Sequence, residues 1–144
     1  MRAIRRVELT KPVVEHVGLL VEDLEQAVAM FTAAFGVEAP VIKELTPVGL
    51  RAAVLKFANV DVELLQYARE DSPLRPVLGQ RTGVNHISVL TEDMEGACRN
   101  LERQGVPLAA GFPRQGSRGL IAFNQPGSAQ GVLMELYQLD PDKK

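Results

Sequence analysis

The chain has 144 residues, of which 46% are hydrophobic and 24% are charged, and its formal net charge is -2. This composition is typical of a globular domain with its own core and excludes a disordered chain. The small negative net charge excludes the basic surface that nucleic-acid-binding proteins need, and no apolar run in the sequence is long enough to span a membrane.

The first predicted element is a strand at VEHVGLLV, residues 14–21, in which apolar residues alternate with a second set that includes His16. Asp23 is a favourable N-cap, and LEQAVAMFTAAF then has helical spacing as far as Gly36. Because alternate strand residues face opposite sides, we expect Val17 to pack against this helix and His16 to face away from it.

Two or three antiparallel strands are predicted after this helix, in GLRAAVLKFANVDVELLQYA, residues 49–68. Glu63 lies in the middle of the last of these strands, between two apolar residues. The next segment is rich in Pro and Gly and predicts a linker over residues 71–81.

The second half of the chain repeats the first. VEHVGLLVEDLEQA, residues 14–27, returns seventy residues later as VNHISVLTEDMEGA, residues 84–97, with seven of fourteen positions identical. A helix capped by Asp93 and ending at Gly105 is predicted next, followed by the strands of GLIAFNQPGSAQGVLMELYQ, where Glu135 takes the place of Glu63. We interpret the chain as one domain, residues 1–144, made by an internal duplication.

The two histidines of the chain, His16 and His86, occupy the same place in both copies, and the two strand glutamates also correspond. A carboxylate in the middle of an apolar strand needs a partner, because burying an unpaired charge is costly. We therefore interpret His16, Glu63, His86 and Glu135 as ligands of one divalent metal. Two nitrogen and two oxygen donors suit Co, Mn, Ni, Fe or Zn, and the sequence does not choose among them.

The alternatives to a metal site are two structural histidines satisfied by their neighbours and a duplicated pocket that binds an organic ligand.

A metal held by these two histidines and two glutamates would polarise a carbonyl group and stabilise an enolate. A carboxylate at the site, such as Glu135, could then move the proton on the neighbouring carbon atom.

Four stretches of the chain carry a family resemblance. They are HVGLLVEDLEQAVAMF, VELLQYAREDSPL, NHISVLTEDMEGACRNLERQGVPL and GVLMEL, within residues 13–138. On these stretches the chain resembles the vicinal oxygen chelate superfamily, which includes glyoxalase I, fosfomycin and bleomycin resistance proteins, extradiol dioxygenases and methylmalonyl-CoA epimerases. Within it the likeness is greatest to the epimerases.

The resemblance implies an α+β fold in which two tandem βαβββ modules, about residues 12–70 and 82–139, form a curved mixed sheet around a metal-binding cavity. It implies the same four metal ligands. It also implies a metal-dependent epimerase or isomerase that abstracts an acidic α-proton next to a carbonyl, with methylmalonyl-CoA or a related acyl-CoA as substrate. A homodimer is expected by the same resemblance.

Two departures from the epimerases concern catalysis. Their loop glutamate before the glycine at position 49 is missing in Thr46-Pro47-Val48-Gly49, so that Glu44 is the nearest candidate for a catalytic carboxylate. Their GAHG segment is Gly116-Ser117-Arg118-Gly119 here, which exchanges a histidine for an arginine.

Five further residues are candidates for substrate binding. Arg51, Arg114 and Arg118 lie on segments expected to rim the cavity, where arginine could hold a carboxylate or a CoA phosphate; solvated surface positions are the alternative. Tyr67 and Tyr137 each lie an even number of residues from their strand glutamate and so could face the cavity, with core packing as the alternative.

Two other functions stay open from the sequence. One is a glyoxalase I-like lyase or thiol transferase acting on a small electrophile. The other is a non-catalytic protein that binds a small molecule such as an antibiotic. The single cysteine, Cys98, is predicted to be a packing residue, and a chain without cysteine pairs is expected in the cytoplasm.

Overall fold

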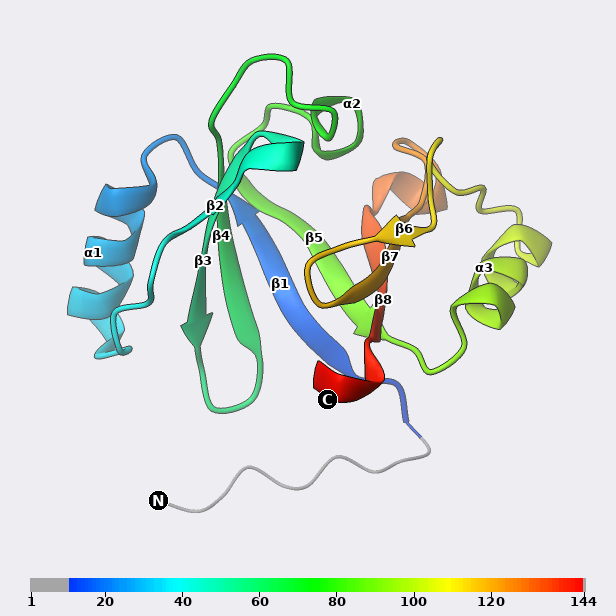
Figure 1. Ribbon diagram of the computed structural model, residues 1–144, viewed down its shortest axis with the longest axis horizontal. Coiled ribbons are helices and arrows are strands. Elements are labelled where there is room, and N and C mark those ends of the chain that lie inside the picture. The colour runs from blue at the N-terminus through cyan, green and yellow to red at the C-terminus, as the bar shows by residue number, and fades with distance from the viewer. Residues whose placement is uncertain (1–10, 144) are drawn as a thin grey trace. The chain divides into compact units, whose positions relative to one another are not determined.

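The computed structural model describes residues 11–143 of the chain (Figure 1). These residues form two compact units. One is His16–Asn85; the other combines the segment that ends at Glu15 with the residues from His86 onward. Within residues 11–143, no helix is both long enough and apolar enough to cross a membrane.

The first module contains four strands in the order β2-β3-β4-β1. Its outer strands pair antiparallel, β2 with β3 and β3 with β4, whereas β1 pairs parallel with β4. The elements are β1 (Val14–Leu20), α1 (Leu24–Phe35), β2 (Lys43–Leu45), the 3-10 helix η1 (Thr46–Val48), β3 (Leu50–Lys56), β4 (Asp61–Tyr67) and α2 (Arg75–Leu78).

The second module repeats this plan with the strand order β5-β8-β7-β6. Here β5 pairs parallel with β8, and the other two pairings are antiparallel. The elements are β5 (Gly83–Leu90), α3 (Met94–Arg103), β6 (Arg114–Gln115), β7 (Gly119–Phe123), η2 (Ala129–Gly131), β8 (Met134–Leu139) and η3 (Pro141–Lys143).

The predicted α+β class and the two tandem βαβββ modules with mixed strand pairing are thus confirmed. The segment predicted as a linker differs in one respect, because it contains the one-turn helix α2. Pro76 lies in the first turn of α2, where a proline removes no helical hydrogen bond, so a Pro-rich segment is compatible with this turn.

In the first module, α1 packs on one face of the sheet. Asp23 caps the helix by accepting from the Gln26 amide, and Gly36 ends it in the left-handed conformation that glycine adopts easily. The core between helix and sheet consists of Leu24, Ala53, Leu55 and Leu64, with Leu19, Val21 and Val62 against it. The expected packing of the Val17 side of β1 against the helix is confirmed by Leu19 and Val21.

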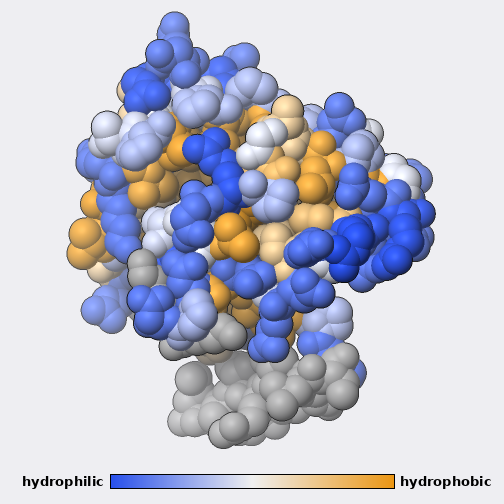
Figure 2. Space-filling model, turned by 45° about the vertical axis from the view of Figure 1, so that its right-hand side comes forward, coloured by the Kyte–Doolittle hydropathy of each residue, from blue (hydrophilic) through white to orange (hydrophobic). Residues whose placement is uncertain are grey.

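In the second module, α3 packs on the equivalent face. Its core is Met94, Cys98 and Ala122, with Leu120 and Leu136 against it. Burial raises the pKa of the Cys98 thiol, which keeps it protonated and agrees with its predicted packing role. The outward side of α3 is charged, and Figure 2 shows hydrophilic surface over the side of the molecule where α3 lies.

A glycine at the start of β7 permits close contact between two strands. A Cβ atom at Gly119 would lie 2.0 Å from the carbonyl oxygen of Gln138 on β8. Only a residue without a side chain fits at that distance, so Gly119 allows β7 to approach the strand that carries Glu135.

Candidate functional site

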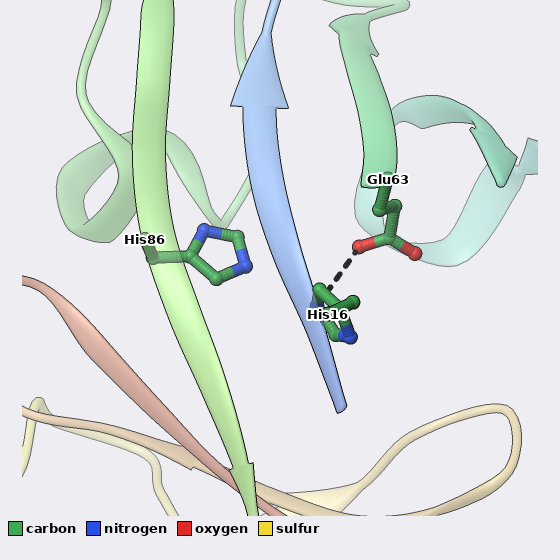
Figure 3. A group of neighbouring side chains, drawn as sticks. All are labelled: His16, Glu63 and His86. Atoms are coloured by element: carbon green, nitrogen blue, oxygen red, sulfur yellow. Dashed lines mark ion pairs between the residues drawn. The ribbon is translucent and has the colours of Figure 1, made fainter. Parts of the chain in front are cut away.

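The first module brings its predicted histidine and glutamate together. His16 lies on β1 and Glu63 on β4, and because Gly18 is the register partner of Glu63, the two side chains share one face of the sheet. The His16 Nε2 atom lies 3.4 Å from Glu63 Oε1 (Figure 3). His16 is almost fully buried, whereas 23% of the Glu63 side chain is exposed.

The second module forms the same pair, with both side chains nearly inaccessible to solvent. His86 on β5 and Glu135 on β8 have side chains only 2% and 7% exposed, and His86 Nε2 lies 3.9 Å from Glu135 Oε1. The Phe123 ring meets the His86 ring edge-on, with 5.2 Å between the ring centroids. Aromatic packing of this kind fixes the orientation of the imidazole.

The functional face of each sheet is the one opposite its helix. In the first module the residues on the helix-covered face of β3 and β4 include Ala53 and Leu64, and Glu63 lies on the other face. In the second module Leu136 lies on the helix-covered face, and Glu135 lies on the other. Each histidine–glutamate pair is therefore directed away from the hydrophobic core of its module.

Arg51 and Glu44 do not lie on the functional face. In the register of β3 with its neighbours, Arg51 is opposite both Glu44 and Gln66, which places all three on the helix-covered side. The Arg51 guanidinium forms ion pairs with Glu44, at 3.2 Å, and with Glu25 of α1. This arrangement speaks against the predicted catalytic role of Glu44 and the predicted substrate contact of Arg51, because both side chains are directed away from Glu63.

Tyr67 shares the face of Glu63, as the even spacing predicted. Its hydroxyl donates a hydrogen bond to the Gly79 carbonyl, and the Arg75 guanidinium lies 4.1 Å from the centroid of its ring. Burial raises the pKa of its hydroxyl. These contacts hold Tyr67 against the segment after β4, and its contact with a substrate stays a prediction.

Tyr137 and Arg118 form a cluster on the functional side of the second module. Tyr137 lies on the same face of β8 as Glu135, and the Arg118 guanidinium is 5.2 Å from the centroid of its ring. Burial raises the pKa of the Tyr137 hydroxyl, although the neighbouring Arg118 acts in the opposite direction. Arg118 also forms an ion pair with Glu15 at 3.4 Å.

Arg114 lies at the edge strand of the same sheet. It is the register partner of Ile121 on β7, and Ile121 is in turn the partner of Tyr137. Because partners across a sheet share a face, Arg114 lies on the side of Glu135 and is exposed to solvent there. Arg114 and Arg118, unlike Arg51, thus stay compatible with their predicted substrate contacts.

Two glutamines that the sequence analysis missed connect the ligand strands to the helices. The side-chain oxygen of Gln66 accepts a hydrogen bond from the Leu24 amide at 3.0 Å, and that of Gln138 accepts from the Met94 amide at 2.7 Å. Each glutamine follows its strand glutamate by three residues, so the repeated spacing in ELLQ and ELYQ was a signal that could have identified them.

Comparison with known proteins defines the family. Residues 15–123 match the model of the Glyoxalase/Bleomycin resistance protein/Dioxygenase superfamily, which corresponds to the superfamily that the sequence resembles. The match covers more than half of the chain and both histidines, and the chain belongs to this superfamily.

The similar proteins include several epimerases. The chain is 30% identical over 128 residues to an ethylmalonyl-CoA/methylmalonyl-CoA epimerase of Cereibacter sphaeroides, covering 86% of this chain and 96% of that protein. A crystal structure of methylmalonyl-CoA epimerase from Mycobacterium tuberculosis matches with a TM-score of 0.77 at 28% identity, covering 90% of this chain and 89% of the other. A methylmalonyl-CoA epimerase in complex with methylmalonyl-CoA and NH4+ matches with a TM-score of 0.77 at 29% identity, covering 92% and 98%.

Proposed function

We propose that this protein is a metal-dependent isomerase that moves the α-proton of an acyl-CoA thioester, with methylmalonyl-CoA or a related malonyl-type thioester as substrate. The observation that carries the proposal is the histidine–glutamate pair that each module forms on its functional face. The similarity to epimerases over most of the chain supports the same reaction class.

The donor set of these residues fits a divalent transition metal. Each pair offers one imidazole nitrogen and one carboxylate oxygen, and in the proposal His16, Glu63, His86 and Glu135 together hold one ion. Ligand atoms about 2.1 Å from an ion lie about 3.0 to 3.4 Å apart in octahedral or tetrahedral geometry. The separations within the two pairs, 3.4 and 3.9 Å, are close to this range.

A metal bound by these four residues would act as a Lewis acid toward the thioester carbonyl and lower the pKa of the α-proton. We assign removal of the α-proton to Glu135; a second proton donor in exchange with solvent would return a proton from the other face of the enolate. The Glu135 side chain is 7% exposed, so that little water competes for the proton it takes, and the Phe123 ring beside His86 contributes to the exclusion of water.

The substrate's own charges have candidate partners in the second module. Arg118 lies beside Tyr137 on the side of Glu135, and a guanidinium is suited to holding a carboxylate through two hydrogen bonds. We propose that Arg118 binds the substrate carboxylate and that the exposed Arg114 binds a CoA phosphate. Glu44 is left out of this scheme because it pairs with Arg51 on the opposite face.

The test is proton exchange. Purified protein, stripped of metal and reloaded with Co(II), is mixed with methylmalonyl-CoA in deuterium oxide, and loss of the α-proton signal is followed by NMR. We expect exchange that depends on the added metal. Exchange that is absent with every candidate metal, while methylmalonyl-CoA still binds, would favour a non-catalytic binding protein. Turnover of a glutathione adduct instead would favour the lyase or thiol transferase.

A histidine variant separates the metal from the rest of the site. His86→Ala removes one of four proposed ligands, and we expect it to weaken Co(II) binding at least about 100-fold, with a corresponding loss of exchange. Isothermal titration calorimetry measures the affinity directly. Unchanged metal affinity in this variant would contradict the proposed ligand set.

The homodimer and the cytoplasmic location expected from the sequence remain predictions. Light scattering on the purified protein measures the first, and fractionation of cells that express the protein measures the second.

A further inference from the structure

A buried serine, Ser88, lies opposite the proposed proton-transfer residue Glu135 in the sheet. Ser88 on β5 has no exposed surface, and among the residues that the structure describes its Oγ atom has no hydrogen-bond partner. Most buried polar side chains are hydrogen-bonded, because an unsatisfied buried hydroxyl destabilises the folded protein. The presence of a serine at this position therefore needs an explanation other than packing.

The register of the sheet shows which group the hydroxyl can reach. Ser88 is the direct partner of Glu135 in the parallel pairing of β5 with β8, and it lies two residues after His86 on the same face of β5. Neighbouring strands lie about 4.8 Å apart, so the two side chains begin at about this separation. A serine hydroxyl at this place is therefore within reach of the Glu135 carboxylate.

The first module lacks this hydroxyl. Its residue opposite the glutamate is Gly18, the register partner of Glu63. The two modules otherwise repeat the histidine, the glutamate and the capping glutamine. The serine thus accompanies the glutamate that is more deeply buried.

A second buried serine shows what a structural serine does in this protein. The Ser72 hydroxyl donates to the Val48 carbonyl at 2.6 Å and accepts a hydrogen bond from the Leu74 amide. Ser72 is 3% exposed, so that its burial is comparable with that of Ser88. Ser72 stabilises a loop through these two bonds, whereas Ser88 has no such structural bond.

We propose that Ser88 is a positioning residue for Glu135: its hydroxyl donates a hydrogen bond to one carboxylate oxygen when the other oxygen binds the metal. This inference rests on the proposed metal site. The hydrogen bond would restrict rotation of the carboxylate and hold its metal-binding oxygen in one direction. Outer hydrogen bonds to ligating carboxylates are known to tune metal affinity in this way.

The proposal makes opposite predictions for two properties of one variant. In Ser88→Ala, the midpoint of thermal unfolding of the metal-free protein is expected to stay unchanged or to rise, because an unsatisfied hydroxyl has been removed. Co(II) affinity, measured by calorimetry, is expected to fall about 10- to 100-fold. The matched control Ser72→Ala is expected to lower the unfolding midpoint and leave Co(II) affinity unchanged.

A second pair of variants keeps the test valid if the alanine variant does not fold. Ser88→Thr and Ser88→Val have nearly the same shape and differ in the hydroxyl. We expect the threonine variant to bind Co(II) at least 10-fold more tightly than the valine variant. Equal affinities in this pair, or wild-type affinity in Ser88→Ala, would overturn the role of Ser88. A lower unfolding midpoint of metal-free Ser88→Ala, with no loss of affinity, would show a structural role instead.

The failure of the proposed function has a different signature. If the wild-type protein binds no Co(II), the proposed metal site is contradicted, and the inference about Ser88 loses its basis. If wild type and Ser88→Ala both bind Co(II) with the same affinity, the metal site stands and only the role of Ser88 is contradicted.

Discussion

The two modules contain the same histidine–glutamate pair but place the glutamate in different environments. The Glu63 side chain is 23% exposed and faces a glycine across the sheet, whereas the Glu135 side chain is 7% exposed and faces Ser88. In the second module the Phe123 ring also lies beside the histidine. The two modules therefore repeat the donor residues but differ in the surroundings of the glutamate, so that the roles of the two glutamates can differ.

This difference matters for chemistry because electrostatic interactions are stronger in a less polar environment. A solvent-exposed carboxylate acts mainly as a ligand, since water can exchange protons with it. A carboxylate at a shielded position can take the α-proton with little competition from water, while the replacing proton comes from the other face of the enolate. On this basis Glu135 is assigned the proton transfer and Glu63 the role of ligand.

The largest expected effect tests this assignment. Glu135→Gln is expected to lower the rate of α-proton exchange about 100- to 10,000-fold, the range for loss of a general base. Glu63→Gln is expected to weaken metal binding about 10- to 100-fold, so that excess metal restores most of the rate. Proton exchange followed by NMR at rising Co(II) concentration separates the two cases.

The assignment would be reversed if excess metal restored the rate of α-proton exchange in Glu135→Gln but not in Glu63→Gln. Equal losses that metal does not restore would show that the difference in exposure has no functional meaning. The unfolding midpoint of both variants serves as a control for correct folding.

A smaller effect is expected where the modules are alike. Gln66→Ala and Gln138→Ala each remove the acceptor of the first amide of a helix, and each is expected to lower the free energy of unfolding by about 1 kcal/mol. This corresponds to a decrease of about 4 °C in the unfolding midpoint for a chain of this size. Thermal unfolding followed by circular dichroism measures it. A much larger loss in one module alone would show that the two helices are capped differently.

The smallest effect concerns the ion pair between the first helix and its sheet. The Arg51 guanidinium lowers the pKa of the Glu25 carboxyl below its ordinary value of 4.5. Because the folded pKa is lower than the unfolded one, the pair contributes stability above about pH 4.5 that is lost as the pH falls through the folded pKa. Glu25→Gln is expected to lower the unfolding midpoint by about 1 °C at pH 7 and to have no effect at low pH.

The matched variant for this ion pair lies at the corresponding position of the second helix. Glu95 pairs with Arg99 within α3, where both side chains are exposed. We expect Glu95→Gln to change the midpoint less than Glu25→Gln does. A difference between Glu25→Gln and the wild type that persists at pH 2 would contradict the assigned pKa direction.

Much of the fold could be predicted from the repeat. The caps at Asp23 and Asp93, the helix end at Gly36 and the face of β1 that carries His16 are local features, and the structure confirms them. The repetition of both residue types predicted a shared ligand set, and the structure brings a histidine and a glutamate together within each module. These features are predictable because each depends on a few neighbouring residues.

The faces on which Arg51 and Glu44 lie could not be predicted from the sequence. Whether Arg51 shares a face with Glu63 depends on the register between β3 and β4, and a shift of one residue moves a side chain to the other side of the sheet. The turn between these strands has no sequence signature that fixes the register. The face of Arg51, and with it the pairing with Glu44, therefore required the structure.

Ser88 was not identified for a different reason. A serine in a strand with alternating apolar residues is compatible with either a buried or an exposed position, and its side chain carries no charge that demands a partner. Its significance depends on the absence of exposed surface and on its position opposite Glu135. Neither property can be inferred from one sequence.

The capping glutamines have a consequence for spectroscopy. Amides in the first turn of a helix normally exchange rapidly with solvent, because no carbonyl of the helix accepts from them. The Leu24 and Met94 amides are instead bound by side chains that lie three residues after each proposed ligand glutamate. Their exchange rates therefore report, one module at a time, whether each glutamate-bearing strand remains attached to its helix when a ligand binds.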